Sequence, residues 1–115
     1  MSVEWPDGSL EIEPRAVESM LADASTEFLL LDCRTAEESA IASIGGTLLP
    51  MQELPERISE LEDHAGSRVV VYCHSGRRSL MVTQFLLRSG FASVCSMRGG
   101  IEAWSLEIDP TVPRY

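Results

Sequence analysis

Two short apolar runs, each followed by a stretch that suits a helix, constrain the fold of this chain most strongly. The runs are "FLLL" at 28–31 and "VVVY" at 69–72, and their length suits buried strands. After the second run, Leu80, Met81, Phe85 and Leu86 recur at helical spacing. Strands that alternate with helices are typical of an α/β domain with a largely parallel sheet. A chain of 115 residues suffices for one such domain.

The rest of the chain follows the same pattern of alternating strands and helices. The predicted strands are a short one at Ile12, 28–33, a short one in "GTLLPM", 69–73 and 91–97. Helices are predicted at 14–24, at 52–63 and, as a short one, in "GGIEAW". Another helix begins at Thr35, with Glu38 as its capping-box partner. A further helix runs from the loop after residue 73 to Ser89 and Gly90, where the glycine ends it. We expect a single domain over 1–115, with its core at about 12–104 and an irregular tail at 106–115.

The charges are distributed unevenly along the chain. The net charge is −9, which argues against a nucleic-acid partner, because binding to phosphates needs an excess of basic residues. Residues 64–101 contain five arginines and no acid, whereas residues 1–63 hold fifteen of the eighteen acids. The basic stretch predicts an anion-binding zone, with a chance asymmetry of the surface as the alternative. The acidic half is either a solvated face or a docking surface for a basic partner.

The three cysteines do not form a disulfide pattern. Cys33, Cys73 and Cys95 are odd in number and lack C-x-x-C spacing, which suits a reducing compartment. For Cys33 and Cys95 we favour packing in the core over a resolving or relay role. With His64 and His74 as the only histidines, no zinc site is expected. No apolar run approaches the roughly 20 residues of a membrane span, and the N-terminus lacks a secretory signal, so we expect a cytoplasmic protein and no membrane partner.

The segment "CHSGRRS" at 73–79 joins a strand to a helix and contains groups that stabilise an anion. The first amides of a helix have no partners within the helix, and the helix dipole favours negative charge there. Gly76 allows a tight turn, and Arg77 and Arg78 add positive charge. Each feature favours the thiolate of Cys73, which is the nucleophilic form of cysteine. We therefore predict an activated cysteine at this turn.

At this point the sequence resembles a known family. "LLLDCR", then "CHSGRRS" and then "GFASVCSMRGGIEAW" are similar in order and spacing to the D-x-R, C-x-x-G-x-R-S and G-G-x-x-x-W segments of the rhodanese homology domain. The resemblance covers about residues 12–104. It implies a doubly wound, mostly parallel five-stranded sheet with helices on both faces, and sulfur transfer through a cysteine persulfide.

The resemblance also implies roles for individual residues. Cys73 matches the cysteine that carries sulfur, and Asp32 and Arg34 match a pair that supports the site. The loop that holds the persulfide matches His74, Ser75, Gly76, Arg77, Arg78 and Ser79, and both Ser79 and Trp104 match positions with a structural role. The segment 39–46 departs from the family pattern E-Y/F-x-x-G-H-I-P-G-A, because Ser39 replaces its aromatic residue and Ser43 its histidine. This change could widen the mouth of the site.

These observations together predict a sulfurtransferase that needs no metal and no organic cofactor. The donor is a small sulfur compound such as thiosulfate, and the acceptor is cyanide, a small thiol or a protein thiol. One alternative is a rhodanese-like module without turnover that binds a partner, relays sulfur or senses oxidants. Another is a cysteine phosphatase, but its loop has five residues between cysteine and arginine, whereas four lie between Cys73 and Arg78.

Overall fold

Five parallel strands form one sheet in the order β1-β5-β4-β2-β3. The computed structural model describes residues 5–6 and 8–115. The strands are β1 (Glu11–Ile12), β2 (Leu29–Asp32), β3 (Thr47–Leu48), β4 (Arg68–Tyr72) and β5 (Ser93–Met97). The helices are α1 (Pro14–Ala22), α2 (Ala36–Ile41), α3 (Leu54–Arg57), α4 (Arg77–Arg88) and α5 (Gly100–Glu107), and the 3-10 helices η1 (Met51–Glu53) and η2 (Ile58–His64) flank α3.

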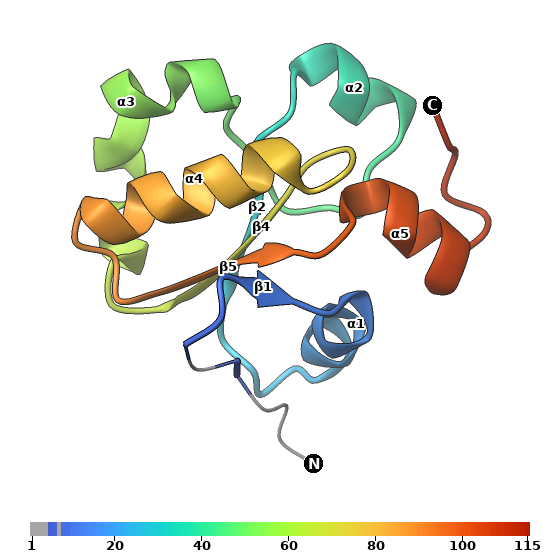
Figure 1. Ribbon diagram of the computed structural model, residues 1–115, viewed down its shortest axis with the longest axis horizontal. Helices are drawn as coiled ribbons and strands as arrows, with labels where there is room; N and C mark the ends of the chain where they lie inside the picture. Colours follow the sequence, from blue (N-terminus) through green and yellow to red (C-terminus); the bar gives the residue numbers. More distant parts are fainter. Residues whose placement is uncertain (1–4, 7) are drawn as a thin grey trace.

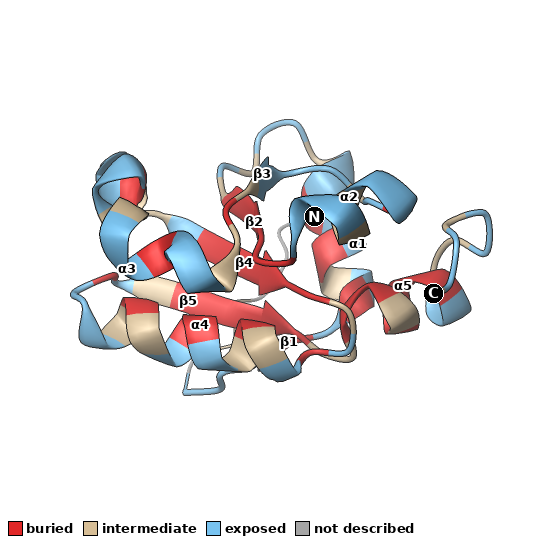
Figure 2. Ribbon diagram, turned by 90° about the horizontal axis from the view of Figure 1, so that it is seen from above, coloured by how far each residue is buried: buried red, intermediate tan, exposed pale blue. Residues whose placement is uncertain are grey.

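Helices cover both faces of the sheet, as predicted for a doubly wound α/β fold. Helices α3 and α4 lie on one face, and α1 and α5 lie on the other (Figure 1). Each face has its own apolar layer, because successive side chains of a strand point to opposite sides. Val69 and Val71 of β4 pack under α3 and α4, whereas Val70 and Tyr72 pack on the side of α1 and α5. Strand β4 is buried on both faces along most of its length (Figure 2).

The register of the central strands determines which residues meet at the carboxyl edge of the sheet. Asp32 of β2 pairs with Tyr72 of β4, so the residues that follow them, Cys33 and Cys73, leave the sheet side by side. The Cys33 amide donates to the Tyr72 carbonyl at 3.2 Å and continues the ladder by one residue. In an open parallel sheet, this edge is where binding sites form.

The prediction of a single α-helix over residues 52–63 is wrong in part. Only Leu54–Arg57 is α-helical, and 3-10 turns precede and follow it. Arg57 departs from helical angles, with φ −115° and ψ 9°, and its guanidinium is held by Glu53 and Glu60 on either side. Leu54 and Leu61 are still buried, so the apolar pattern reports packing against the sheet rather than a continuous α-helix.

Other predicted boundaries differ by one or two residues. Helix α1 ends at Ala22 rather than 24, strand β2 is one residue shorter at each end than 28–33, and α5 continues to Glu107, past the expected start of the tail. The capping box of Thr35 and Glu38 is confirmed. Residues 1–4 and 7, which belong to the N-terminal segment used to predict location, lie outside the described residues. In the part of the chain that the structure describes, no helix is long and apolar enough to cross a membrane.

Candidate active site

The Cys73 sulfur lies inside the turn between β4 and α4. The Gly76 amide donates to Sγ at 3.1 Å and the Ser79 amide at 3.3 Å, while the Ser79 hydroxyl lies 3.4 Å from Sγ. The hydroxyls of Ser79 and Ser96 are 2.7 Å apart, so Ser96 on β5 can donate to Ser79 while Ser79 donates to sulfur. Ser79 therefore contributes to both the packing of α4 and the surroundings of the thiol.

Gly76 makes the tight turn possible. Its φ is +98°, a left-handed conformation that glycine adopts without the steric cost of a Cβ. It directly precedes α4, and its own amide and that of Ser79 in the first turn of the helix point toward the sulfur. The turn at Gly76 thus brings two loop amides to the Cys73 sulfur.

Helix α5 holds the cysteine loop from the opposite side. The Ile101 amide donates to the Cys73 carbonyl at 2.9 Å, and the Glu102 amide donates to the His74 carbonyl at 3.0 Å. Gly100 permits this approach, because a Cβ at that position would lie 2.5 Å from the carbonyl oxygens of Cys73 and His74. The sequence pattern "GGIEAW" predicted only a helix start, so this contact is a finding of the structure.

The pKa of Cys73 is lowered to about 4. The largest cause is a hydrogen bond from the Cys33 side chain, followed by the Ser79 hydroxyl and the amides of Ser79 and Gly76. Burial acts in the opposite direction, because it disfavours a charged sulfur. The hydrogen-bond donors lower the pKa by more than burial raises it, so Cys73 is a thiolate at neutral pH. Beside this thiolate the pKa of Cys33 is raised, and Cys33 stays protonated.

The charge of Arg78 is not free to bind an anion. Its guanidinium forms two hydrogen bonds, at 2.6 and 2.8 Å, with the carboxylate of Glu38 in α2. Arg78 holds the pKa of Glu38 down at about 2, so this pair stays ionised at neutral pH. The Arg78 charge still attracts the charge of Cys73, so the pairing with Glu38 adds to its expected role. Its guanidinium also joins the cysteine loop to α2.

The wider arginine zone is also partly neutralised. Arg98 pairs with Glu13, which is distant in sequence, and with Glu107, which lies just beyond the stretch, so the acid-free stretch 64–101 does not correspond to an acid-free surface. Among the described residues, Arg77 has no carboxylate partner, and its side chain is exposed at the start of α4. Arg77 is therefore the loop arginine whose charge faces solvent without a carboxylate beside it.

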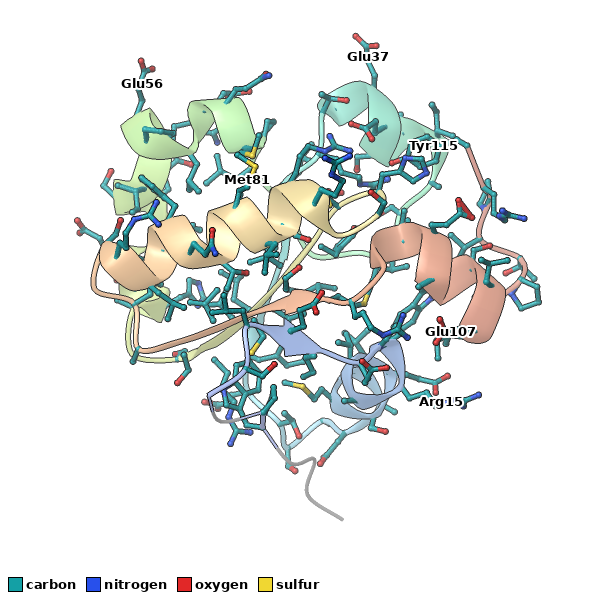
Figure 3. All side chains as sticks on the ribbon, viewed as in Figure 1. Arg15, Glu37, Glu56, Met81, Glu107 and Tyr115 are labelled. Carbon is teal, nitrogen blue, oxygen red and sulfur yellow. The ribbon has the colours of Figure 1, made fainter. Side chains whose placement is uncertain are left out.

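The C-terminal segment reaches the site, which the sequence did not indicate. Tyr115 lies next to α2 in Figure 3, and its ring stacks on His74 with centroids 4.2 Å apart. The Tyr115 hydroxyl donates to Glu38 at 2.7 Å and accepts from Arg34 at 2.9 Å. His74 is thus a partly exposed wall of the loop, while Ser75 is exposed.

Asp32 and Arg34 form a buried ion pair beside the loop. Arg34 donates to both carboxylate oxygens of Asp32, at 2.9 and 2.8 Å, and also to the Ala42 carbonyl at 2.7 Å. Asp32 accepts from the Tyr72 hydroxyl at 3.2 Å. The pair therefore joins the ends of β2 and β4 to the segment after α2, and it does not contact the Cys73 sulfur directly.

Comparisons with known proteins agree with this architecture. The rhodanese-like domain family matches residues 13–107. The chain belongs to this family. A sulfurtransferase of Allochromatium vinosum is 40% identical over 96 residues, which cover 83% of this chain and 87% of that protein. The rhodanese-like fold, predicted from three sequence segments, is thereby confirmed.

Two further relatives of the rhodanese-like chain are much longer proteins. The maize adenylyltransferase and sulfurtransferase MOCS3-2 is 38% identical over 101 residues, which are 83% of this chain and 21% of the maize protein. The crystal structure of a thiosulfate sulfurtransferase from Pseudomonas aeruginosa superposes with a TM-score of 0.78 at 30% identity, over 92% of this chain and 20% of that one. The chain thus spans about a fifth of each of these two proteins.

Proposed function

We propose that the protein transfers a sulfane sulfur from a donor such as thiosulfate to a thiophilic acceptor through a persulfide on Cys73. The observation that carries this proposal is the Cys73 sulfur itself, which accepts hydrogen bonds from two loop amides at the start of α4. A thiolate held in this way is a nucleophile at neutral pH. The names of the relatives, which include two sulfurtransferases and a thiosulfate sulfurtransferase, support the same chemistry.

In the first step, the Cys73 thiolate attacks the outer sulfur of thiosulfate. The sulfur–sulfur bond of the donor breaks, and sulfite leaves with its electron pair. In the second step, a nucleophilic acceptor attacks the outer sulfur of the persulfide, and Cys73 leaves as the thiolate. The acceptor is cyanide, a small thiol or a protein cysteine, all of which react through the same step. The site residues His74, Ser75, Gly76, Arg77, Arg78 and Ser79 surround the persulfide, and Asp32 and Arg34 support the loop.

The size of the site favours sulfur over a phosphoryl group. Only 1% of Cys73 is exposed, and its sulfur is enclosed by Gly76, Ser79 and Cys33. The single guanidinium that a phosphatase would aim at phosphate oxygens, that of Arg78, is bound to Glu38. The persulfide adds a single sulfur atom to Cys73, so it fits this enclosed site better than a covalently bound phosphoryl group with its three oxygens does.

Turnover assays on Cys73 variants test the proposed function. The purified protein should form thiocyanate from thiosulfate and cyanide, and it should not hydrolyse an aryl phosphate. Cys73→Ser should lose thiocyanate formation while its circular dichroism spectrum stays unchanged. Cys95→Ser is the matched control, because it removes a buried thiol from the opposite face of the sheet and should keep the activity. Turnover that survives in Cys73→Ser, or aryl phosphate hydrolysis that depends on Cys73, would contradict the proposal.

A further inference from the structure

A second thiol lies directly beside the proposed sulfur carrier. Cys33 follows β2 and Cys73 follows β4, and these two strands are parallel neighbours with Asp32 paired to Tyr72. Both cysteines are 1% exposed and belong to the same apolar layer, under α3 and α4. Backbones of neighbouring strands are about 4.8 Å apart, which lies within the range of about 4.4–6.8 Å that a disulfide spans between Cα atoms. The strand register thus places the two cysteines on neighbouring chain segments whose general spacing is compatible with a disulfide.

Cys33 and Ser79 approach Cys73 from opposite flanks of β4. Ser79 contacts the Cys73 sulfur and is held by Ser96 of β5, on one flank of β4. Cys33 comes from β2, on the other flank, because β4 lies between β5 and β2. The Cys33 thiol also lies 3.5 Å from the Tyr72 carbonyl, so it has a second partner when it does not donate to Cys73.

We propose that Cys33 resolves the Cys73 persulfide, so that hydrosulfide is released and a Cys33–Cys73 disulfide remains. This inference rests on the proposed function, which supplies the persulfide. The Cys33 sulfur attacks Sγ of Cys73, the bond between Sγ and the outer sulfur breaks, and the outer sulfur leaves with the electron pair. The proton of Cys33 goes to the leaving sulfur, so a thiol and a persulfide anion give a disulfide and HS⁻. Cys33 is oxidised and the outer sulfur is reduced, and no external oxidant is needed.

This reaction gives the protein two outcomes for the same bound sulfur. When an acceptor is present, the outer sulfur is transferred and Cys73 returns as the thiolate. When no acceptor arrives, Cys33 displaces the outer sulfur as hydrosulfide, and the disulfide that forms leaves Cys73 unable to accept another sulfur. A thiol reductant, such as dithiothreitol in the laboratory, restores both thiols. Cys95 cannot resolve the Cys73 persulfide, because it lies in the apolar layer on the other face of the sheet.

An anaerobic experiment with one equivalent of thiosulfate tests the reaction. The reduced wild-type protein is mixed with thiosulfate without an acceptor, and samples are analysed over time by intact mass spectrometry, by non-reducing peptide mapping and with a sulfide-selective probe. We expect first a species one sulfur atom heavier, with the sulfur on Cys73. It should then convert into a species two hydrogen atoms lighter than the reduced protein, with Cys33 joined to Cys73 and one sulfide released per chain.

Two variants make the result specific. Cys33→Ser keeps a hydrogen-bond donor beside Cys73, so it should keep the persulfide and release no sulfide, whereas Cys95→Ser should behave as the wild type does. Wild-type protein incubated anaerobically without thiosulfate should stay reduced, which shows that the disulfide comes from the persulfide. A wild-type persulfide that lasts as long as that of Cys33→Ser, or a disulfide that includes Cys95, would overturn this inference alone. If Cys73 gains no sulfur in any of these proteins, the proposed function falls together with the inference.

Discussion

At the scale of single residues, the chemistry of the site depends on which hydrogen-bond donors surround one sulfur atom. Cys73 receives the Gly76 and Ser79 amides, and the Ser79 hydroxyl and the Cys33 thiol are also within its reach. These donors favour the charged form of the thiol, whereas burial opposes it. The outcome is a pKa of about 4, far below the ordinary value of 9.0. The reactive form of the cysteine is therefore present before any substrate binds.

The pH dependence of Cys73 alkylation tests this conclusion. Since a thiolate persists above its pKa, the rate with iodoacetamide should stay constant from pH about 8 to about 6 and fall only as the pH approaches about 4. Ser79→Ala removes one donor and should raise the pKa by about one pH unit. Peptide mass spectrometry measures the rate at Cys73, with the unfolded protein as reference. A folded-state rate that drops tenfold per pH unit below pH about 8 would mean an ordinary thiol.

At the scale of secondary-structure elements, two helices position the cysteine loop. Helix α4 begins inside the loop, while α5 donates two amides to its carbonyl groups from the other side. Gly100 is the point of closest approach, with φ +62° and no room for a Cβ. The loop is thus fixed by backbone contacts that a single methyl group would break.

Substituting two glycines compares a crowded position with an open one. Gly90→Ala places a side chain at φ +100° with no atom within 4 Å, so it should cost only the left-handed conformation, about 1 kcal/mol. Gly100→Ala adds a clash with two backbone carbonyls and should cost about 3 kcal/mol or more. Urea unfolding and thiosulfate turnover measure both effects, and Gly100→Ala should also lose most of its activity. Equal effects of the two substitutions would show that α5 does not position the loop.

How far the sequence predicted these elements depends on how local their causes are. The capping box of Thr35 and Glu38 and the turn at Gly76 arise within a few residues, and both were predictable. The pairing of Glu38 with Arg78 joins residues that are 40 positions apart, so no local pattern indicates it. The adjacency of Cys33 and Cys73 did leave a signal, because "LLLDC" and "VVVYC" place a cysteine at the same position after two strands.

At the scale of the whole molecule, folding pairs two of the five arginines in residues 64–101 with carboxylates. The chain carries a net charge of −9, and ion pairs with carboxylates neutralise Arg78 and Arg98. The uneven distribution of charge along the sequence is thus partly removed when the chain folds. Among the loop residues, the positive charge without a carboxylate partner is that of Arg77, at the N-terminal end of α4.

Two exposed arginines on α4 provide a matched test of this electrostatic attraction. Arg77→Ala should raise KM for thiosulfate by about threefold and weaken the dependence of kcat/KM on salt, because the anion loses the charge nearest the site. Arg88→Ala removes the same charge from the far end of the helix and should change neither quantity. Steady-state kinetics at low and high ionic strength measure both. A similar response in the two variants would mean that only net charge matters.

Rapid-quench mass spectrometry after a brief exposure to thiosulfate tests most directly whether Cys73 carries the transferred sulfur. We predict that wild-type protein becomes one sulfur atom heavier, that fragmentation places this atom on Cys73, and that added cyanide removes it with formation of an equal amount of thiocyanate. Cys73→Ser should gain no sulfur. A wild-type protein that never gains the atom, or that carries it on Cys33 or Cys95 instead, would contradict a persulfide on Cys73 as the intermediate.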